Sequence, residues 1–253
     1  MIDLHSHILP GVDDGSQSVE MSLQMLQAAF ESGIDTVVST SHCYPRAEEN
    51  IDSFLSRREH SFEKLKNAIS VIENIPEIVL GCEVNVTTDI AEMKNIGKLC
   101  IQGTDYILVE MPHGHWKEWM IDTVYKLTLL GLKPIMAHID RYMAHNSELL
   151  NALFELDVIY QVNTDLFIDR RMKKFADKLL ETGHLHVLGS DMHNLTSRKP
   201  NFSEACEIIT KRYGKCFFDD VTDNTIAILQ NKSIPHPFIS VEKTSGFWAK
   251  IFK

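Results

Sequence analysis

The chain has 253 residues, of which 44% are hydrophobic and 24% charged, the profile of a soluble globular protein. Its formal net charge of −10 argues against nucleic acid as a partner, because binding phosphates needs a basic surface. Five irregularly spaced cysteines favour a reducing compartment over a disulfide framework, and Asp3, His5 and His7 interrupt any amino-terminal signal peptide.

Short apolar segments alternate with longer amphipathic ones along the chain. The segments that predict strands are residues 2–4, 35–42, 77–84, 105–111, 133–139, 158–163 and 186–191. Helical periodicity predicts helices at residues 19–30, 52–74, 117–130, 146–156, 169–182, 202–213 and 222–231. Ser18 is the expected N-cap of the first helix, and Gly33 is expected to end it.

This alternation predicts parallel βαβ units. About seven such units favour a single-domain α/β barrel over an open sheet. We expect the barrel to span residues 1–237, followed by a tail at 238–253.

Side chains that can bind metal stand where the predicted strands end. They are His5 and His7, His42, Glu83, Glu110, His138, and Asp191 with His193. The carboxyl ends of parallel strands meet at one face of a barrel, where active sites are built. Imidazole nitrogens and carboxylate oxygens gathered there predict a metal site.

The first strand illustrates the spacing. Residues two apart in a strand share a face, so Asp3, His5 and His7 are expected to point into the barrel. Ile2 and Leu4 are then expected to face the helices.

Other histidines have plainer interpretations. His184 and His186 repeat the His-x-His spacing but precede the last strand, so we expect structural or surface roles near the opposite mouth. His113 and His115 follow Glu110 in a glycine-containing loop, where contact with substrate or solvent is favoured over metal binding. Three more lie in polar helical or tail segments and are expected to be solvated: His60, His145 and His236.

Cys206 and Arg212 match the C-x5-R pattern of cysteine-dependent tyrosine phosphatases. That chemistry needs a glycine-rich loop that cradles phosphate, whereas this match lies inside a predicted amphipathic helix. We therefore expect Cys206 to be an ordinary helix cysteine.

The motifs DLHSHILPGVDDGS, STSH, GCEV, ILVEMP, AHIDRY and SDMHN occur in this order. Over roughly residues 1–235 they resemble the bacterial manganese-dependent protein tyrosine phosphatases of capsule and exopolysaccharide operons. These enzymes belong to the polymerase and histidinol phosphatase (PHP) superfamily. The resemblance implies a distorted (β/α)7 TIM-like barrel that holds up to three divalent metal ions, usually manganese, with iron or zinc as alternatives.

The resemblance also implies three groups of ligands, and Glu83 belongs to the first two. They are His5, His7, Glu83 and Asp191 for one ion; Glu83, Glu110 and His138 for a second; and His42, His193 and Asp14 for a third. Asp13 is adjacent to Asp14, and spacing does not choose between them.

Two arginines are implied to bind the substrate phosphate: Arg141 in AHIDRY, and Arg198 as a second candidate in the loop after SDMHN. A salt bridge from Arg141 to Asp140 is the structural alternative. His42 and His193 are candidates to donate a proton to the leaving group.

The implied activity is hydrolysis of phosphotyrosine by direct attack of a metal-bridging hydroxide, without a phosphoenzyme. The implied substrate is an autophosphorylating tyrosine kinase that regulates capsule or exopolysaccharide synthesis. A small-molecule phosphoesterase, such as a histidinol-phosphate phosphatase, is the alternative within the same chemistry. A non-catalytic metal-binding regulator is the alternative of another class. A homo-oligomer in the cytoplasm, at the inner face of the membrane, is also expected.

The last residues, KTSGFWAKIFK at 243–253, combine aromatic and apolar side chains at helical spacing with three lysines. A disordered or core-docked terminus is the plainer interpretation. The alternative is a weak, reversible contact with a membrane surface that carries anionic lipid.

Overall fold

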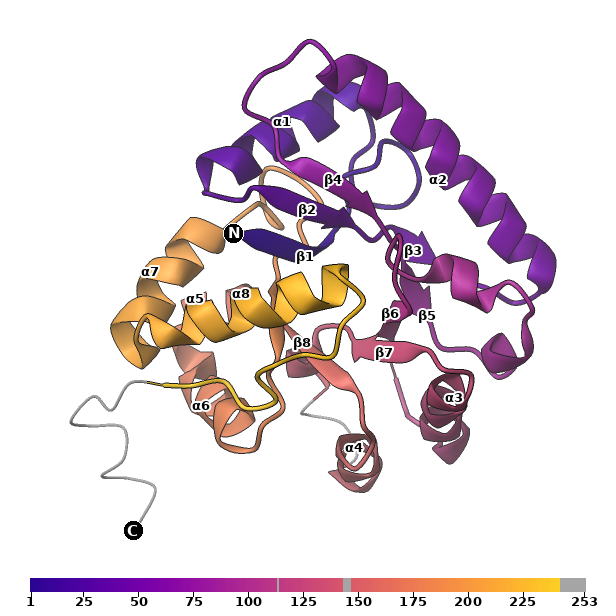
Figure 1. Cartoon of the computed structure of the whole chain (residues 1–253), viewed down its shortest axis with the longest axis vertical. Coiled ribbons are helices and arrows are strands. Elements are labelled where there is room, and N and C mark those ends of the chain that lie inside the picture. The colour runs from indigo at the N-terminus through magenta and orange to yellow at the C-terminus, as the bar shows by residue number, and fades with distance from the viewer. Residues whose placement is uncertain (113, 143–146, 242–253) are drawn as a thin grey trace.

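A computed structural model describes residues 1–112, 114–142 and 147–241 (Figure 1). The expectations for His113, His145 and the tail at 243–253 lie outside the described residues. Within the described ranges, strands and helices alternate as the sequence predicts.

The strands and helices have the following bounds. The strands are β1 (Ile2–Ser6), β2 (Thr36–Ser39), β3 (His42–Cys43), β4 (Glu77–Leu80), β5 (Glu83–Asn85), β6 (Tyr106–Glu110), β7 (Lys133–Met136), β8 (Ile159–Asn163) and β9 (Val187–Gly189). The α-helices are α1 (Val19–Glu31), α2 (Glu48–Ile69), α3 (Glu118–Leu129), α4 (Ser147–Phe154), α5 (Asp165–Ile168), α6 (Lys173–Glu181), α7 (Phe202–Tyr213) and α8 (Cys216–Leu229). Short 3₁₀ turns are η1 (Ile90–Glu92), η2 (Ile96–Leu99), η3 (Ile139–Arg141) and η4 (Arg170–Met172).

The parallel strands form a ring. One sheet has the order β1-β2-β4, and the other has the order β3-β5-β6-β7-β8-β9. Only two residues join β2 to β3 and only two join β4 to β5, so each pair occupies one strand position. The ring closes between β1 and the end of β9, where Ser6 bridges Met192 and the His7 amide donates to the Met192 carbonyl (2.9 Å). The described strands therefore confirm the distorted seven-position barrel that the sequence predicts.

Two hydrophobic clusters separate the inside of the ring from its helical coat. Along β6, Tyr106 and Leu108 belong to an inner cluster, whereas Ile107 and Val109 belong to an outer one. The outer cluster contains residues of α1, α2, α3, α6 and α7, so it lies beneath these helices. The inner cluster contains Leu4, Val38, Ile101, Tyr106, Leu108, Ile135, Ala137, Ile159, Val187 and Ile228.

The prediction for β1 was wrong in part. Leu4 is fully buried in the inner cluster and does not face the helices. Asp3 accepts hydrogen bonds from the Ser190 amide (2.8 Å) and the Ser190 hydroxyl (2.5 Å). The pairing of β1 with β2 shifts register between Asp3 and Ser6, so simple alternation fails along this strand.

Helix ends follow local signals where these are strong. Ser18 accepts a hydrogen bond from the Met21 amide (3.2 Å) and caps α1, and Gly33 follows the helix with φ of +82°. Both are as predicted. In contrast, α2 ends at Ile69 instead of 74, and α8 begins at Cys216 instead of 222.

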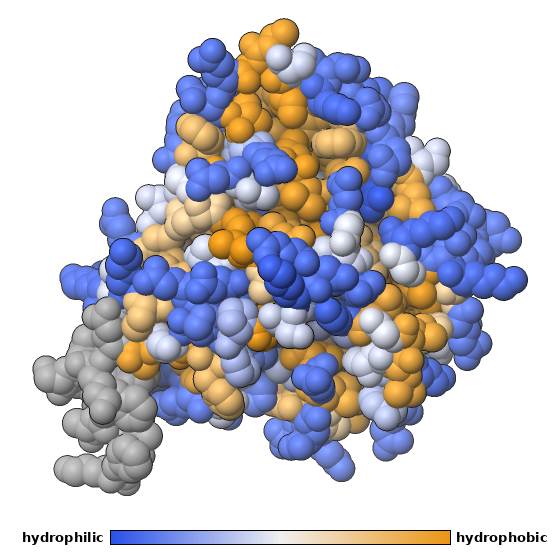
Figure 2. All heavy atoms as spheres, in the orientation of Figure 1, coloured by the Kyte–Doolittle hydropathy of each residue, from blue (hydrophilic) through white to orange (hydrophobic). Residues whose placement is uncertain are grey.

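The packed chain extends beyond residue 237. Ile239 is buried in the outer cluster, and the Ser240 amide donates to Asp220 (2.6 Å). Figure 1 shows α8 crossing in front of the strands, and Figure 2 shows hydrophilic side chains interspersed with apolar ones on this face. Among the described residues, no helix is long and apolar enough to cross a membrane.

Candidate metal centre

The sequence-predicted ligands meet at the carboxyl ends of the strands. β1 and the residues after it supply His5 and His7, the starts of β3 and β5 supply His42 and Glu83, and the end of β6 supplies Glu110. The segments after β7 and β9 supply His138, and Asp191 with His193. All of these are buried or nearly so, whereas the Asp14 side chain is 69% exposed at the rim.

The first group matches the edges of a metal coordination polyhedron. The His5 Nε2 atom lies 3.1 Å from both His7 Nε2 and Glu83 Oε2, and 3.5 Å from Asp191 Oδ1. His7 Nε2 lies 3.3 Å from Glu83 Oε2 and 3.4 Å from Asp191 Oδ1. Metal–ligand distances of about 2.1 Å give edges of roughly 3.0 Å in an octahedron and 3.4 Å in a tetrahedron.

The two carboxylate oxygens of Glu83 point toward different sets of histidines. Its Oε2 atom lies among His5, His7 and His42, while its Oε1 atom lies 2.7 Å from His138 Nε2. The same His138 nitrogen is 3.5 Å from Glu110 Oε1. A carboxylate directed to both sides in this way can bridge two ions.

Asp14 lies between two imidazoles. Its Oδ1 atom is 3.5 Å from His42 Nε2 and 3.6 Å from His193 Nε2. His42 also turns its Nδ1 atom toward Glu83 (3.0 Å), so this imidazole stands between two possible ion positions. Asp13 has other contacts: it accepts from His7 Nδ1 (2.8 Å) and from the His42 amide (2.8 Å).

Gln161, which sequence reasoning missed, and Asp13 orient the first histidines. Gln161 Oε1 accepts from His5 Nδ1 (3.1 Å) and from the His138 amide (2.7 Å), and Asp13 holds His7 Nδ1. Such partners of metal-bound imidazoles fix the ring tautomer and orientation. The sequence did hold a cue that β8 contributes to the site, because the strand ends with the polar residue Asn163. In the structure, the Asn163 side-chain amide donates to Asp191 Oδ2 (3.2 Å).

The hydrogen bonds of His5 and His7 leave two imidazole lone pairs facing each other, which is unfavourable unless a cation lies between them. Both Nδ1 atoms of His5 and His7 face acceptor oxygens, which places their protons there. Their Nε2 lone pairs then face each other at 3.1 Å. In addition, buried Asp191 Oδ1 and His193 Nε2 have no well-formed hydrogen bond within the described residues. These side chains fit a metal cluster.

The backbone packs closely around the site. A Cβ atom at Gly189 would lie 2.5 Å from His5 Cβ, and one at Gly15 would lie 2.3 Å from the His7 carbonyl oxygen. His138 and Asp191 have positive φ angles of 33° and 54°, which L-residues rarely adopt. Such strained backbone clusters at functional sites.

Where His5 and His7 are protonated they keep the buried carboxylates ionised, and where they are neutral ligands a bound ion would supply that positive charge instead. Burial alone would raise the pKa of Glu83, but the His5 charge and hydrogen bonds from nearby imidazoles hold it well below its usual value. Burial opposes ionisation of Asp191 as well, yet His5, His7 and Arg141 keep its pKa well below normal. Burial and the charge of His7 lower the pKa of His193 to about 3, which suits a neutral ligand.

Both predicted arginines lie beside Asp191. Arg141 forms an ion pair with Asp191 Oδ2, and Arg198 Nη2 lies 2.6 Å from the same oxygen. Their side chains are 35% and 33% exposed, so both reach the open end of the site. Asp140, the alternative partner of Arg141, instead accepts a hydrogen bond from the Asn163 amide (3.0 Å).

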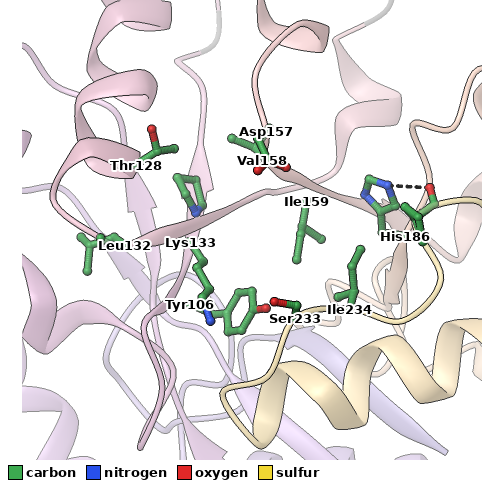
Figure 3. Close-up of a pocket in the computed structure, with 13 residues that line it drawn as sticks. Tyr106, Thr128, Leu132, Lys133, Asp157, Val158, Ile159, His186, Ser233 and Ile234 are labelled. Atoms are coloured by element: carbon green, nitrogen blue, oxygen red, sulfur yellow. Dashed lines mark hydrogen bonds between the residues drawn. The ribbon is translucent and has the colours of Figure 1, made fainter.

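The residues predicted to stand outside the site do so. His186 lines a cavity of about 580 Å³ at the amino ends of β6 to β9, the opposite mouth (Figure 3). Its Nε2 atom donates to the Pro237 carbonyl (3.1 Å) and its Nδ1 atom accepts from the Tyr160 amide (3.0 Å). His184 stacks on Phe154, with ring centroids 3.7 Å apart.

The cysteine and the other described histidines that were predicted to lie outside the site also do so. Cys206 lies within α7, and burial raises the pKa of its thiol to about 11. His60 and His115 are exposed, and His236 is partly exposed beside Asp223.

Comparisons with known proteins place the chain in a family. A family model described as capsular polysaccharide synthesis, CpsB/CapC, matches residues 1–230. Tyrosine-protein phosphatase CpsB of Streptococcus agalactiae serotype V is 32% identical over 92% of this chain and 100% of its own length. Tyrosine-protein phosphatase YwqE of Bacillus subtilis is 30% identical over 98% of this chain and 100% of its own.

A solved structure agrees as well. It comes from a report on YwqE from Bacillus subtilis and CpsB from Streptococcus pneumoniae, described as unique metal-dependent tyrosine phosphatases. It superposes with a TM-score of 0.80 and 26% identity, covering 96% of this chain and 100% of the other.

Proposed function

Because the chain belongs to the CpsB/CapC family of capsular polysaccharide synthesis proteins, we propose that it is a metal-dependent tyrosine-protein phosphatase. It is then a hydrolase of phosphoric monoesters. The convergence of imidazole and carboxylate ligands beside two arginines carries this proposal, since the first set suits metal ions and the second suits phosphate.

Three groups of residues would hold the ions. They are His5, His7, Glu83 and Asp191; Glu83, Glu110 and His138; and His42, His193 and Asp14. Ions bound there would supply a water nucleophile at neutral pH and neutralise phosphate oxygens. Manganese is the proposed metal, with iron or zinc as alternatives, because no thiolate belongs to the ligand set.

Arg141 and Arg198 would bind the phosphoryl oxygens. A guanidinium offers several donors to one phosphate, and this contact gains strength as charge develops in the transition state. Phenolate is a comparatively good leaving group, so direct hydrolysis needs no strong acid. His42 and His193 are the candidate proton donors, and only an imidazole that is not committed to metal could serve.

The proposed substrate is a phosphotyrosine protein, and specifically an autophosphorylating tyrosine kinase that regulates capsule or exopolysaccharide synthesis. The family description supports the pathway, and no basic surface for nucleic acid is expected from a chain of net charge −10. We further propose a cytoplasmic location, which suits five free cysteines, and a homo-oligomeric state.

A comparison of three substrates tests the activity. Manganese-loaded protein should hydrolyse a phosphotyrosine peptide at least about tenfold faster than histidinol phosphate, and should leave a nucleic acid intact. Faster turnover of histidinol phosphate would favour the small-molecule phosphoesterase. Metal binding with no turnover of any substrate would favour the non-catalytic regulator.

A further inference from the structure

An aromatic side chain that the metal centre does not use stands at its rim. Tyr44 follows β3 directly and is 56% exposed. Its ring centroid lies 5.4 Å from that of His42, with the ring planes tilted by 31°. One side of the tyrosine ring therefore meets the candidate ligand, and much of the rest is open to solvent.

The open end of the site has two chemically different parts. Arg141 and Arg198 gather at Asp191, where they offer positive charge. Tyr44 stands at His42, where it offers an apolar aromatic surface. The ring centroids of His42 and His193 are 5.9 Å apart, and His193 Nδ1 is 3.5 Å from Asp191 Oδ1. His42, His193 and Asp191 therefore connect the two parts through successive contacts.

Phosphotyrosine likewise joins an anionic part to an aromatic part. A single ester oxygen joins its phosphate to its phenyl ring, so the ring must lie close to the metal cluster whenever the phosphate is bound. A ring directed away from the arginines comes to the His42 side. Aromatic rings attract each other at centroid separations of 4.5–7 Å in tilted or offset arrangements.

We propose that Tyr44 is a specificity-determining residue whose ring packs against the phenyl ring of the substrate and selects aryl over alkyl phosphates. This inference rests on the proposed phosphatase function. Tyr44 needs only its ring for the contact, so phenylalanine should replace it and alanine should not.

Binding of inert phosphonates isolates the contribution of the ring. Benzylphosphonate presents a phenyl ring and methylphosphonate lacks one, and neither has a leaving group. Calorimetric titration of manganese-loaded protein gives the ratio of their dissociation constants. Tyr44→Ala should reduce the preference for benzylphosphonate about three- to tenfold, the usual contribution of an aromatic pair. Tyr44→Phe should keep it.

Tyr125→Ala is the matched control, since Tyr125 is 49% exposed on α3 and should leave the ratio unchanged. An unchanged ratio in Tyr44→Ala would overturn the inference. So would equal weakening of both phosphonates, which would show that Tyr44 only supports His42. If loaded wild-type protein bound neither phosphonate and hydrolysed no phosphotyrosine, the proposed function itself would fail, and this inference with it.

Discussion

Individual side chains at the candidate metal centre are fixed by their hydrogen-bond and ion-pair partners as much as by their position in the chain. His7 is held by Asp13, His5 by Gln161, and Asp191 by Asn163 and two arginines. Each partner leaves one nitrogen or oxygen directed into the cluster. The chemistry at this scale is therefore sensitive to single substitutions, and the thiol of Cys206 is outside it.

His5→Ala or Asp191→Ala should lower kcat by at least about a hundredfold, because each removes a proposed ligand of the first ion. Cys206→Ser should retain nearly full activity, since its thiol lies in a helix with a raised pKa. Steady-state kinetics on a phosphotyrosine peptide measures both effects. Loss of activity in Cys206→Ser alone would mean that the metal mechanism is wrong.

Arg141→Ala and Arg198→Ala should each reduce kcat/KM for a phosphotyrosine peptide about tenfold or more while metal content stays constant, because a charge-assisted contact to phosphate is lost. Elemental analysis and kinetics on the same samples separate the two properties. Arg171→Ala is the control, because Arg171 is exposed and pairs only with Asp169 on the surface among the described residues. A variant at 141 or 198 that loses metal would instead have a structural role.

At the scale of elements, the ring depends on junctions between segments far apart in sequence. β1 closes against the end of β9, and Asp3 joins the same segments through Ser190. At the opposite mouth, His186 connects β8 to the chain at Pro237 (Figure 3). This buried imidazole accepts one hydrogen bond and donates another, so it must be neutral.

That requirement predicts a pH dependence of stability. Burial lowers the pKa of His186 to about 4, although its hydrogen bond to Pro237 opposes the shift. Between the unfolded value near 6.5 and about 4, only the unfolded chain binds the proton, so this contribution is complete above pH 6.5 and is lost as pH falls. The loss amounts to roughly 3 kcal/mol.

Urea unfolding of metal-free protein from pH 7.5 to 4 measures the effect. Between these pH values the free energy of unfolding should fall by roughly 3 kcal/mol more in wild-type protein than in His186→Asn, because asparagine cannot bind the proton. His60→Asn, at an exposed helix position, should behave as wild type. If the free energy of unfolding fell equally with pH in wild type and His186→Asn, the neutral state assigned to His186 would be contradicted.

The whole molecule is acidic, and part of its negative charge is buried. The chain has a net charge of −10, and Glu83 and Asp191 remain ionised although they are buried. Metal ions at the proposed ligands would offset this charge and would bind only the folded protein, so they should stabilise the fold as well as support catalysis.

Chelation should therefore abolish phosphatase activity and lower Tm, and added manganese should restore both. Elemental analysis, thermal unfolding and kinetics follow the three properties in one dialysis series. Full activity in a sample shown to be free of metal would contradict the proposal.

Residues 243–253 lie outside the described residues, and their membrane contact stays a prediction. Full-length protein should co-sediment with anionic vesicles at low salt, because aromatic and lysine side chains both favour such a surface. Deletion of 243–253 should remove this binding without changing kcat on a soluble peptide. Equal sedimentation of the truncated protein, or its unfolding, would refute the contact.

The sequence by itself determined the barrel and the type of site. Strand and helix periods repeat along the chain, and residues such as His42, Glu83 and Glu110 stand where the predicted strands end, so local pattern alone implies one face and one metal-binding chemistry.

Only the tertiary structure decided how the site is finished. It directs Asp13 to His7 and Asp14 to the rim, brings Arg198 to Asp191, and places the Tyr44 ring beside that of His42. It also shifts β1 so that Leu4 turns inward. These outcomes depend on loop paths and on contacts between segments distant in the chain, and neither leaves a periodic trace in the sequence.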